Sequence, residues 1–537
     1  MRATLTALGL LLALPVLGLL AAWAQLDAAA WSTLQHLSRT VLPDQALQSF
    51  LLAGGVGLGV ALLGAATATA VGLFQFPGRK VFEWALLLPL AMPAYVLAYA
   101  ATDALQPSGP LQAALRAAFG WQGALWPDVR SLPFAVLLFV LALYPYVYVL
   151  ARASLAERAV PLMETARLLG AGLRRRLLEV ALPLARPALA AGVLLALMET
   201  LADFGVGAYF GLTTFTTGVY KAWLVMSDGV AAAQLASSLL AVVACLLWLE
   251  RRAQRRLRFA TARSGSTHGG DARLLRPSAG GAAALVLLCA LPIVLGFVLP
   301  CLWLAWRVWQ ESQQAEFGLP LQRFALWAGH SFALAAAAAL VAAAIALAFG
   351  AVLRAERSTA LSPLRLAART VSLGYAVPGA VIAVGMLAPL GALQAHWPDS
   401  GAGVWLTATV LGLLYAYVVR FSAVAMQSVE AGYARIPAAI DDSARLLGAG
   451  LWRTWFELHR PLLRRAALAA MLLVFVDVMK ELPATLLLRP FGIDTLATVA
   501  YNFARDERLA EAALPSLAIV AVGLIPVALL SRAMRDR

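Results

Sequence analysis

Two short stretches of the sequence place acidic side chains inside otherwise apolar segments. Residues 198–205 are Met-Glu-Thr-Leu-Ala-Asp-Phe-Gly, and residues 477–483 are Asp-Val-Met-Lys-Glu-Leu-Pro. On a helix, Glu199 and Asp203 share one face, as do Asp477 and Glu481, because each pair is separated by four positions. Ionisable groups within membrane spans cost at least ~2.5 kcal/mol each, and they usually face a bundle interior or an aqueous path.

Two roles fit these acids. The four carboxylates could line the translocation path of a hard cation, because hard cations prefer oxygen ligands. Alternatively they are structural, with Lys480 paired either to Asp477, three positions away, or to Asp203 in the other stretch. The number of acids does not separate these roles. We expect no catalytic residue, no cofactor and no resident metal site.

A phosphate-binding loop of the type Gly-x-x-x-x-Gly-Lys-Ser/Thr is absent from the sequence. The lysines are Lys80, Lys221 and Lys480, and none of them follows a glycine. The chain is therefore not expected to be an enzyme that hydrolyses ATP.

The sequence contains an internal repeat. Residues 166–173, Ala-Arg-Leu-Leu-Gly-Ala-Gly-Leu, recur identically as residues 444–451, an offset of 444 − 166 = 278 residues. Self-similarity at a fixed offset indicates a duplicated structural unit. The same offset relates Pro183 to Pro461, Glu199 to Asp477, and Asp203 to Glu481.

The composition is that of a polytopic membrane protein. Hydrophobic residues make up 62% and charged residues 13% of the chain, against roughly 45–50% and 25% in soluble domains. Apolar runs close to the roughly 20 residues that cross a bilayer recur along the chain. We expect an all-α fold with about twelve transmembrane helices, at residues 5–24, 50–73, 83–105, 132–151, 188–207, 231–249, 281–306, 328–352, 370–393, 404–420, 466–487 and 513–531.

These spans divide into two sets of six. Because six is even, both copies of the repeat enter the membrane in the same orientation and form a parallel repeat. The residues between the sets are rich in arginine, glycine and serine, which is typical of a flexible linker. We expect a first helix and outer loop (1–49), a first transmembrane domain (50–250), a linker (251–279), a seventh helix and outer loop (280–327) and a second transmembrane domain (328–537).

The net charge of +14 is explained by membrane topology. With the N-terminus inside, most lysines and arginines fall in the predicted cytoplasmic loops, as the positive-inside rule requires. The expected partner is thus a lipid membrane and not a nucleic acid, and both termini are expected in the cytoplasm. The first apolar run resembles a secretory signal ending near residues 22–24, but it is longer than a usual signal core, so we expect an uncleaved helix.

Each half has one long cytoplasmic loop that carries the repeat. We call residues 152–187 the first duplicated loop and residues 421–465 the second duplicated loop. In the first, Glu164-Thr165-Ala166 is followed after three residues by Gly170 and, after nine more, by Val-Ala-Leu-Pro ending at Pro183. This spacing resembles the EAA loop of ABC importer permeases, and the second duplicated loop resembles it with Asp442 in place of the glutamate and Arg460 in place of the leucine.

The resemblance implies a fold, partners and site residues. It implies a permease of the type I ABC importer kind in the bacterial inner membrane, with a periplasmic binding protein and a separate cytoplasmic ATPase, in two copies that match the two loops. In that family the short helix of the loop docks in a groove of the ATPase. The positions that match this docking element are Glu164, Ala166, Gly170, Gly172, Pro183, Asp442, Ala444, Gly448, Gly450 and Pro461.

A narrower resemblance concerns the substrate. Residues 87–99, 199–223 and 480–485 look like segments of the fused two-domain ferric-iron permeases, which implies ferric iron as the transported substrate. Fused thiamine permeases share this length and layout, and sulfate, polyamine and phosphonate systems have related permeases, so these substrates remain alternatives. The aromatic and hydroxyl residues at 209–223 are either a docking surface for the binding protein or an interfacial aromatic belt.

Two other classes of protein compete with an importer permease. An ion-coupled secondary transporter would use the acids within the spans as proton or sodium relays, but it has no use for two EAA-like loops. A scaffold or channel subunit would not explain why the cytoplasmic loops are duplicated so closely. We therefore expect an ATP-driven importer that works by alternating access.

Overall fold

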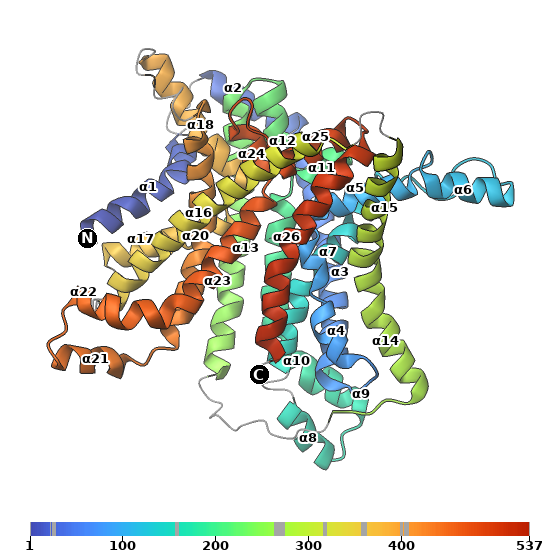
Figure 1. Cartoon of the computed structure of the whole chain (residues 1–537), viewed down its shortest axis with the longest axis horizontal. Coiled ribbons are helices and arrows are strands. Elements are labelled where there is room, and N and C mark those ends of the chain that lie inside the picture. Colours follow the sequence, from blue (N-terminus) through green and yellow to red (C-terminus); the bar gives the residue numbers. More distant parts are fainter. Residues whose placement is uncertain are drawn as a thin grey trace. The chain divides into compact units, whose positions relative to one another are not determined.

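The computed structural model describes residues 2–21, 23, 28–155, 160–261, 274–314, 319–355, 362–397, 401 and 407–535. In this part of the chain the regular structure is helical, apart from one isolated β-bridge between Phe74 and Leu275 (Figure 1). The expected all-α class is confirmed. The proposed cleavage site near residues 22–24 lies almost entirely outside the described residues.

The chain forms two compact units, and each unit combines segments from both halves of the sequence. Unit 1 contains Met1–Leu42, Gly218–Leu240 and Pro320–Val499, and unit 2 contains Pro43–Thr217, Ala241–Leu319 and Ala500–Arg537. Helix α13 (Gly229–Thr261) extends into the expected linker, whose residues 262–273 lie outside the described part. The sequence-based domain boundaries remain a prediction.

Unit 1 is built on three long helices that pack against one another: α16 (Leu321–Ala355), α20 (Val410–Ala434) and α23 (Arg460–Met479). The first helix of the chain, α1 (Arg2–Ala21), packs on α17 (Pro363–Val371) and α18 (Gly379–His396) (Figure 1). The remaining helices of unit 1 are α2 (Ala28–Thr40), η5 (Lys221–Val225), η7 (Gly374–Ala376), α21 (Ala438–Leu446), α22 (Leu451–Arg453), η9 (Thr454–His459) and α24 (Pro483–Leu488).

The contact between α1 and α18 depends on a glycine. A Cβ atom at Gly385 would lie 2.1 Å from the carbonyl oxygen of Pro15, and a Cβ at Gly9 would lie 2.5 Å from the Cβ of Ala367. Small residues at such crossings let helix backbones approach closely within a membrane. Helix α1 therefore packs closely against helices that come from the second half of the sequence.

Unit 2 is centred on α7 (Leu132–Ser154), which packs on α10 (Leu182–Ala202) and α5 (Ala94–Leu105). The last helix, α26 (Leu509–Arg535), packs on α15 (Leu299–Gln314) and on η2 (Leu88–Ala91). The other helices are α3 (Leu42–Leu73), α4 (Arg79–Ala85), α6 (Pro110–Phe119), α8 (Val160–Leu168), α9 (Leu173–Arg175), η4 (Arg176–Ala181), α11 (Gly205–Tyr209), α14 (Ala279–Ile293) and η6 (Val294–Val298). Helices α12 (Phe215–Tyr220), α13 and α25 (Leu496–Arg505) have residues in both units.

Within the described residues, nine helices are long and apolar enough to cross a membrane, or up to eleven if each of two bent helix pairs is one span. The expected fold of about twelve membrane helices compares with these nine to eleven candidates among the described residues. Helix α23, at the eleventh expected span, is not among the candidates, because Arg464, Arg465 and Asp477 all lie within it. The polytopic character itself is confirmed.

The two bent pairs correct two expected spans. Residues 79–91 and 94–119 meet at 88°, and residues 363–376 and 379–391 meet at 116°. A proline lies at each bend, Pro93 and Pro378, and the residue before it, Met92 or Val377, has extended backbone. A proline disfavours helical backbone in the residue that precedes it, so the expected helices at 83–105 and 370–393 are broken.

The repeat seen in the sequence is also a structural repeat. Helices α7, α8 and α9 begin at residues 132, 160 and 173, while α20, α21 and α22 begin at 410, 438 and 451. The differences are 410 − 132 = 278, 438 − 160 = 278 and 451 − 173 = 278. The π-helical turns η4 and η9 that follow also keep this offset, since 454 − 176 = 278.

Candidate functional site

The first duplicated loop is a helical hairpin closed by a glycine turn. Helix α8 ends at Leu168, and the amide of Gly170 then donates to Arg167 O at 2.9 Å while the amide of Ala171 donates to Ala166 O at 3.0 Å. These two bonds are the Schellman arrangement that ends many helices, and it requires a left-handed residue after the last turn. Gly170 supplies it with a φ of 82°.

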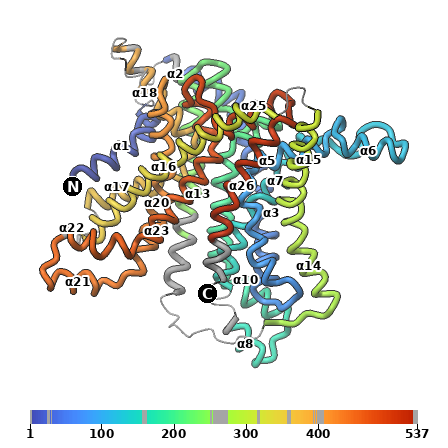
Figure 2. The backbone as a smooth tube through the Cα atoms, viewed as in Figure 1, coloured from blue at the N-terminus to red at the C-terminus, as the bar shows by residue number. Residues whose placement is uncertain are grey.

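The second duplicated loop repeats this turn atom for atom. The amides of Gly448 and Ala449 donate to Arg445 O and Ala444 O at 2.9 and 3.0 Å, and Gly448 has a φ of 75°. Figure 2 shows the chain reversing between α21 and α22. Ala166 and Ala444 thus serve as acceptors in the turn, a role that does not depend on their side chains.

The second glycine of each loop has a different environment. Gly172 has a φ of −64°, which any residue can adopt, and Gly450 also lacks a positive φ. A Cβ atom at either position would meet nothing within 4 Å. Neither the local backbone nor the packing of this chain therefore requires glycine there.

Both turns display a pair of leucines to the outside. Leu168 and Leu169 are 82% and 83% exposed, and Leu446 and Leu447 are 90% and 84% exposed. Such exposure of large apolar side chains at two equivalent positions is typical of an interaction surface. The acids of the motif lie nearby and are about half exposed, with Glu164 3.6 Å from Arg167 and Asp442 3.7 Å from Arg445.

The prolines of the motif begin the helices that follow. Pro183 is the second residue of α10 and Pro461 the second residue of α23, and each helix directly follows a π-helical turn, η4 or η9. The other eight predicted loop residues lie in the two hairpins, and the two prolines lie in the helices that follow them.

A polar cluster behind the second loop was not predicted from the sequence. Asp441 accepts from Arg354 Nε at 2.6 Å and lies 2.7 Å from His459 Nε2, while Tyr433 OH lies 3.5 Å from His459 Nδ1. We call these four residues the loop latch, because they join α21 to α16, η9 and α20. Burial opposes ionisation of Asp441, but the hydrogen bonds from His459 and Arg354 outweigh it, so the pKa of this carboxyl lies below its ordinary value.

The first loop has no such latch at the equivalent positions. Subtracting 278 from Tyr433, Asp441 and His459 gives Leu155, Met163 and Ala181, and all three are buried. A position-by-position comparison of the two repeats is the signal that could have revealed this difference. The two loops thus expose equivalent outer surfaces, but only the second is attached to its neighbouring helices by the loop latch.

Two of the acids within the apolar segments cap short helices. Asp203 Oδ1 accepts from the amide of Val206 at 2.8 Å, at the start of α11. Glu481 accepts from the amides of Ala484 and Thr485 at 2.9 and 3.0 Å, at the start of α24. Helix N-termini favour such carboxylates, so the equivalence of these two acids, inferred from the repeat, has a structural counterpart.

Glu481 also forms a buried ion pair with Arg420, which sequence reasoning missed. Arg420 Nη1 lies 2.9 Å from Glu481 Oε1, and the two side chains are 10% and 1% exposed. A Cβ atom at Gly379 would lie 2.6 Å from Glu481 Oε1 and 2.9 Å from Arg420 Nη1. An arginine at the end of an apolar run, opposite an acid in the same half, is the signal that could have identified this pair.

The other charged residues of these segments are less enclosed. Lys480 Nζ lies 2.9 Å from Asp477 Oδ1, with 33% and 16% of the side chains exposed, which is the pairing at three positions that we considered. Glu199 is half-buried near the end of α10. Among the described residues, no group of three or more His, Cys, Asp or Glu side chains could hold a metal ion.

The aromatic residues at 209–223 fit neither predicted role well. Tyr209, Phe210, Phe215 and Tyr220 are buried, so these four side chains contribute little to a docking surface or a lipid-facing belt, whereas Trp223 is half-exposed. The exposed apolar residues of this region lie just beyond them, at Leu224, Val225 and Met226.

A second polar cluster lies in unit 2 and was also missed. Buried Asp103 on α5 accepts from Trp303 Nε1 at 2.9 Å and lies 2.7 Å from Arg307 Nε, both on α15. The seventh expected span is thereby joined to a helix of the first half of the sequence.

Comparison with known proteins identifies the repeated domain. Residues 61–259 match the family described as the inner membrane component of binding-protein-dependent transport systems. This match covers the first duplicated loop and the helices around it.

The chain is also similar to permeases over most of its length. An Fe(3+)-transport system permease protein of Haemophilus influenzae is 24% identical over 512 residues, which cover 93% of this chain and 92% of the relative. A ferric transport system permease protein of Actinobacillus pleuropneumoniae is 24% identical over 483 residues, or 86% of this chain and 66% of the relative. A putative 2-aminoethylphosphonate transport system permease protein of Salmonella typhimurium is 30% identical over 162 residues, or 30% and 59%.

The family match, the full-length similarity and the two equivalent hairpins agree with one another. The resemblance seen in the sequence is confirmed. Residues 61–259 carry the domain of the inner membrane components of binding-protein-dependent transport systems, and over 93% of its length the chain is similar to an Fe(3+)-transport system permease.

Proposed function

We propose that this permease moves ferric iron from a periplasmic binding protein into the cytoplasm by ATP-driven alternating access. The observation that carries the proposal is the pair of hairpins with the same turn geometry and the same exposed leucines. Two equal apolar surfaces on one chain fit two copies of one partner, which is what a dimeric ATPase presents.

The ATPase contact is proposed to lie at the turns of the two duplicated loops. Glu164, Ala166, Gly170 and Gly172 form the first contact, and Asp442, Ala444, Gly448 and Gly450 form the second. The absence of a structural reason for glycine at 172 and 450 supports a close external approach, because glycine is otherwise used where another backbone comes near. The chain itself lacks a phosphate-binding loop, so ATP hydrolysis is assigned to the partner.

The proposed substrate rests on two full-length relatives named for ferric iron. The alternatives, thiamine, sulfate, a polyamine or a phosphonate, are favoured by no comparable similarity over the whole chain, since the phosphonate permease matches 30% of it. Among the charged residues, Glu199, Asp477 and Lys480 are the better candidates for the translocation path. The carboxylates of Asp203 and Glu481 cap the helices α11 and α24, so we propose that these two acids shape the translocation path and do not bind the substrate.

The test uses a substitution that spares the fold of the permease. In a Gly172→Arg, Gly450→Arg double variant, the new side chains enter open space without backbone strain, so the permease should fold while contact with the ATPase is lost. Gly280→Arg is the matched control, because this glycine also has open space and no positive φ but lies outside both loops.

The measurement is the ATPase activity of the reconstituted transporter with iron-loaded binding protein. Stimulation in the wild type and in Gly280→Arg, together with its loss in the double variant, is the expected result. Stimulation by a binding protein loaded with another ligand would reject iron and keep the importer. Failure of any ATPase to associate with the wild type would reject the importer in favour of an ion-coupled carrier.

We also propose that both termini lie in the cytoplasm, on the same side as the duplicated loops. The excess of basic residues in the loops on that side supports this orientation. A reporter enzyme that is active only in the cytoplasm, fused after Arg537, should be active. Activity only of a periplasmic reporter at the same position would reverse the topology.

A further inference from the structure

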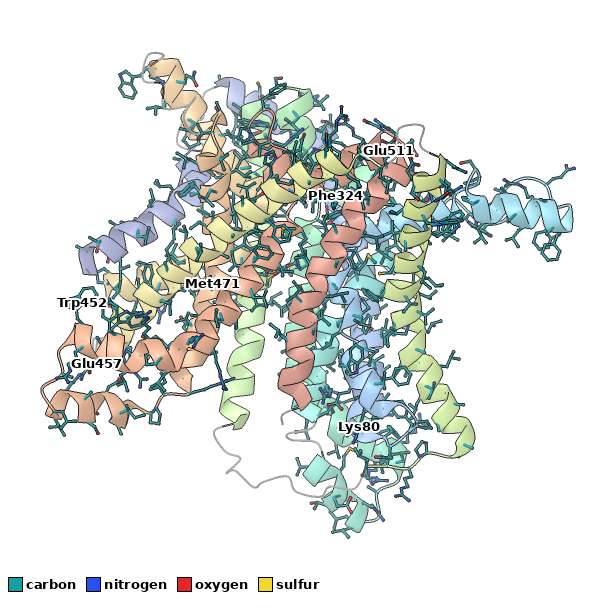
Figure 3. All side chains as sticks on the ribbon, in the orientation of Figure 1. Lys80, Phe324, Trp452, Glu457, Met471 and Glu511 are labelled. Carbon is teal, nitrogen blue, oxygen red and sulfur yellow. The ribbon has the colours of Figure 1, made fainter. Side chains whose placement is uncertain are left out.

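A large cleft lies on the inner side of the second duplicated loop. Its volume is about 1030 Å³, and it is enclosed entirely by unit 1, between the last turns of α16 and the hairpin formed by α21, α22 and η9. Trp452, labelled in Figure 3, is part of the α22 wall. We call this space the α16 cleft.

One wall of the α16 cleft is apolar and belongs to a membrane helix. Ala344, Ala348, Ala351 and Ala355 line it and fall on one helical face, since they are three or four positions apart. Ala344 is exposed and the other three are half-exposed, although α16 is a candidate membrane span. Leu347 and Val352 also line the cleft from this helix, and an apolar wall of this kind suits an alkyl chain.

The opposite wall carries two indole rings. Trp455 is half-buried and Trp452 is 67% exposed. Tryptophan concentrates at the level of lipid headgroups, because its ring combines an apolar body with a polar N–H. The first duplicated loop has Arg174 and Leu177 at the equivalent positions, so this wall is peculiar to the second loop.

The end of the cleft near α21 is basic. Arg354, Arg445 and Asp441 line it, so two guanidinium groups lie there with one carboxylate. Arg354 is engaged by Asp441, whereas the Arg445 side chain is 40% exposed and lies 3.7 Å from the nearest oxygen of Asp442. The side chain of Arg445 can therefore turn toward an anion in the cleft, while Arg354 stays paired with Asp441.

We propose that the α16 cleft binds an anionic phospholipid of the surrounding bilayer, with an acyl chain along the alanine wall and the headgroup phosphate at Arg445. An amphipathic ligand accounts for both the apolar wall and the basic end, whereas a soluble phosphate would leave the alanines and tryptophans without a partner. A basic residue near a membrane surface attracts anionic lipid by electrostatics. The proposal requires only that the chain is embedded in a membrane and is independent of its substrate.

The experiment measures lipid contact at Trp455. The permease alone is reconstituted in phosphatidylcholine that contains increasing fractions of brominated phosphatidylglycerol, which quenches nearby tryptophans. The chain has 15 tryptophans, so the signal of interest is the difference between the wild type and Trp455→Leu, a substitution that installs the residue of the first loop. Brominated phosphatidylcholine at the same fractions is the reference for unselective contact.

The expected result is that this signal is quenched at several-fold lower fractions of the anionic lipid than of the zwitterionic one. Arg445→Gln should reduce the preference about fivefold, and Arg445→Lys should retain it. The matched control Arg167→Gln, at the equivalent position of the first loop, should leave it unchanged.

Three results would overturn the proposal. Equal quenching by both lipids would make the cleft an ordinary lipid-facing groove. Relief of quenching by inorganic phosphate would replace the lipid by a soluble anion. Protection of Trp455 on addition of the ATPase without nucleotide would mean that a protein segment fills the cleft.

Discussion

At the scale of single residues, the two glycines of each duplicated loop have different backbone conformations. Gly170 and Gly448 hold left-handed backbone that ends a helix, and this follows from turn chemistry alone. Gly172 and Gly450 have neither this conformation nor a close neighbour. Nothing within the described part of the chain requires glycine at these two positions.

This difference predicts opposite effects of the same substitution. Gly170→Ala should weaken the turn by about 1–2 kcal/mol, because a Cβ atom is strained in left-handed backbone. Gly172→Ala should leave the turn unchanged or slightly more stable. Hydrogen–deuterium exchange of peptides that cover α8 and its turn measures both. Equal acceleration of exchange in the two variants would contradict the assignment.

The buried pair of Arg420 and Glu481 predicts a non-additive double substitution. Arg420→Ala should destabilise the permease by about 3–5 kcal/mol, because it leaves a buried carboxylate without its counter-ion. Adding Glu481→Gln should recover much of this loss, since the amide carries no charge and can still accept from the start of α24. Thermal unfolding of the purified permease tests this. A double variant less stable than the single one would refute the pairing.

At the scale of elements, the sequence predicted the existence of helices better than their continuity. The apolar runs located the long helices, and the repeat located both hairpins, because hydrophobicity and glycine turns are local signals. The bends at Pro93 and Pro378 were missed, although the prolines were visible, since an apolar run with a proline is compatible with a kinked span. The loop latch was missed because His459 and Asp441 become neighbours only through the hairpin.

The latch predicts a local effect with an internal control. Asp441→Asn should weaken the attachment of α21 by about 1.5–3 kcal/mol, the usual value of hydrogen bonds to charged groups, and speed its amide exchange about ten- to hundredfold. Helix α8 in the same molecule should be unaffected, because Met163 and Ala181 occupy the positions of Asp441 and His459 there. The double variant Asp441→Met, His459→Ala, which installs the residues of the first loop, should exchange more slowly than Asp441→Met alone. Faster exchange of α8 as well would indicate general unfolding.

At the scale of the whole molecule, neither compact unit is made from one half of the sequence. Helix α1 belongs with the second half, and α14 and α15 belong with the first. A division by sequence repeat cannot reveal this, because nothing in an apolar run specifies which of many apolar surfaces it will cover. Close-contact glycines specify it, and they are recognised only once the partner helix is known.

The glycine contact of α1 predicts a position-specific loss of stability. Gly385→Leu on α18 should separate α1 from unit 1 and cost about 1–3 kcal/mol, since the added atoms would overlap the backbone at Pro15. Gly391→Leu on the same helix is the matched control, because a Cβ atom there meets nothing within 4 Å. Cysteine cross-linking between α1 and α18 reports the separation. Undiminished cross-linking in Gly385→Leu would refute the contact.

The two hairpins are attached to the membrane helices by different contacts, and this difference affects how movement of the ATPase would reach those helices. Two copies of the proposed ATPase would contact equivalent leucine pairs. The second hairpin would pass the movement on through the hydrogen bonds of the loop latch, whereas the first hairpin lacks these hydrogen bonds. Directional bonds resist sliding and rotation, whereas apolar contacts permit both at little cost. The same closure of the proposed ATPase dimer would then displace the two halves of the permease by different amounts. The translocation pathway would open by an asymmetric movement.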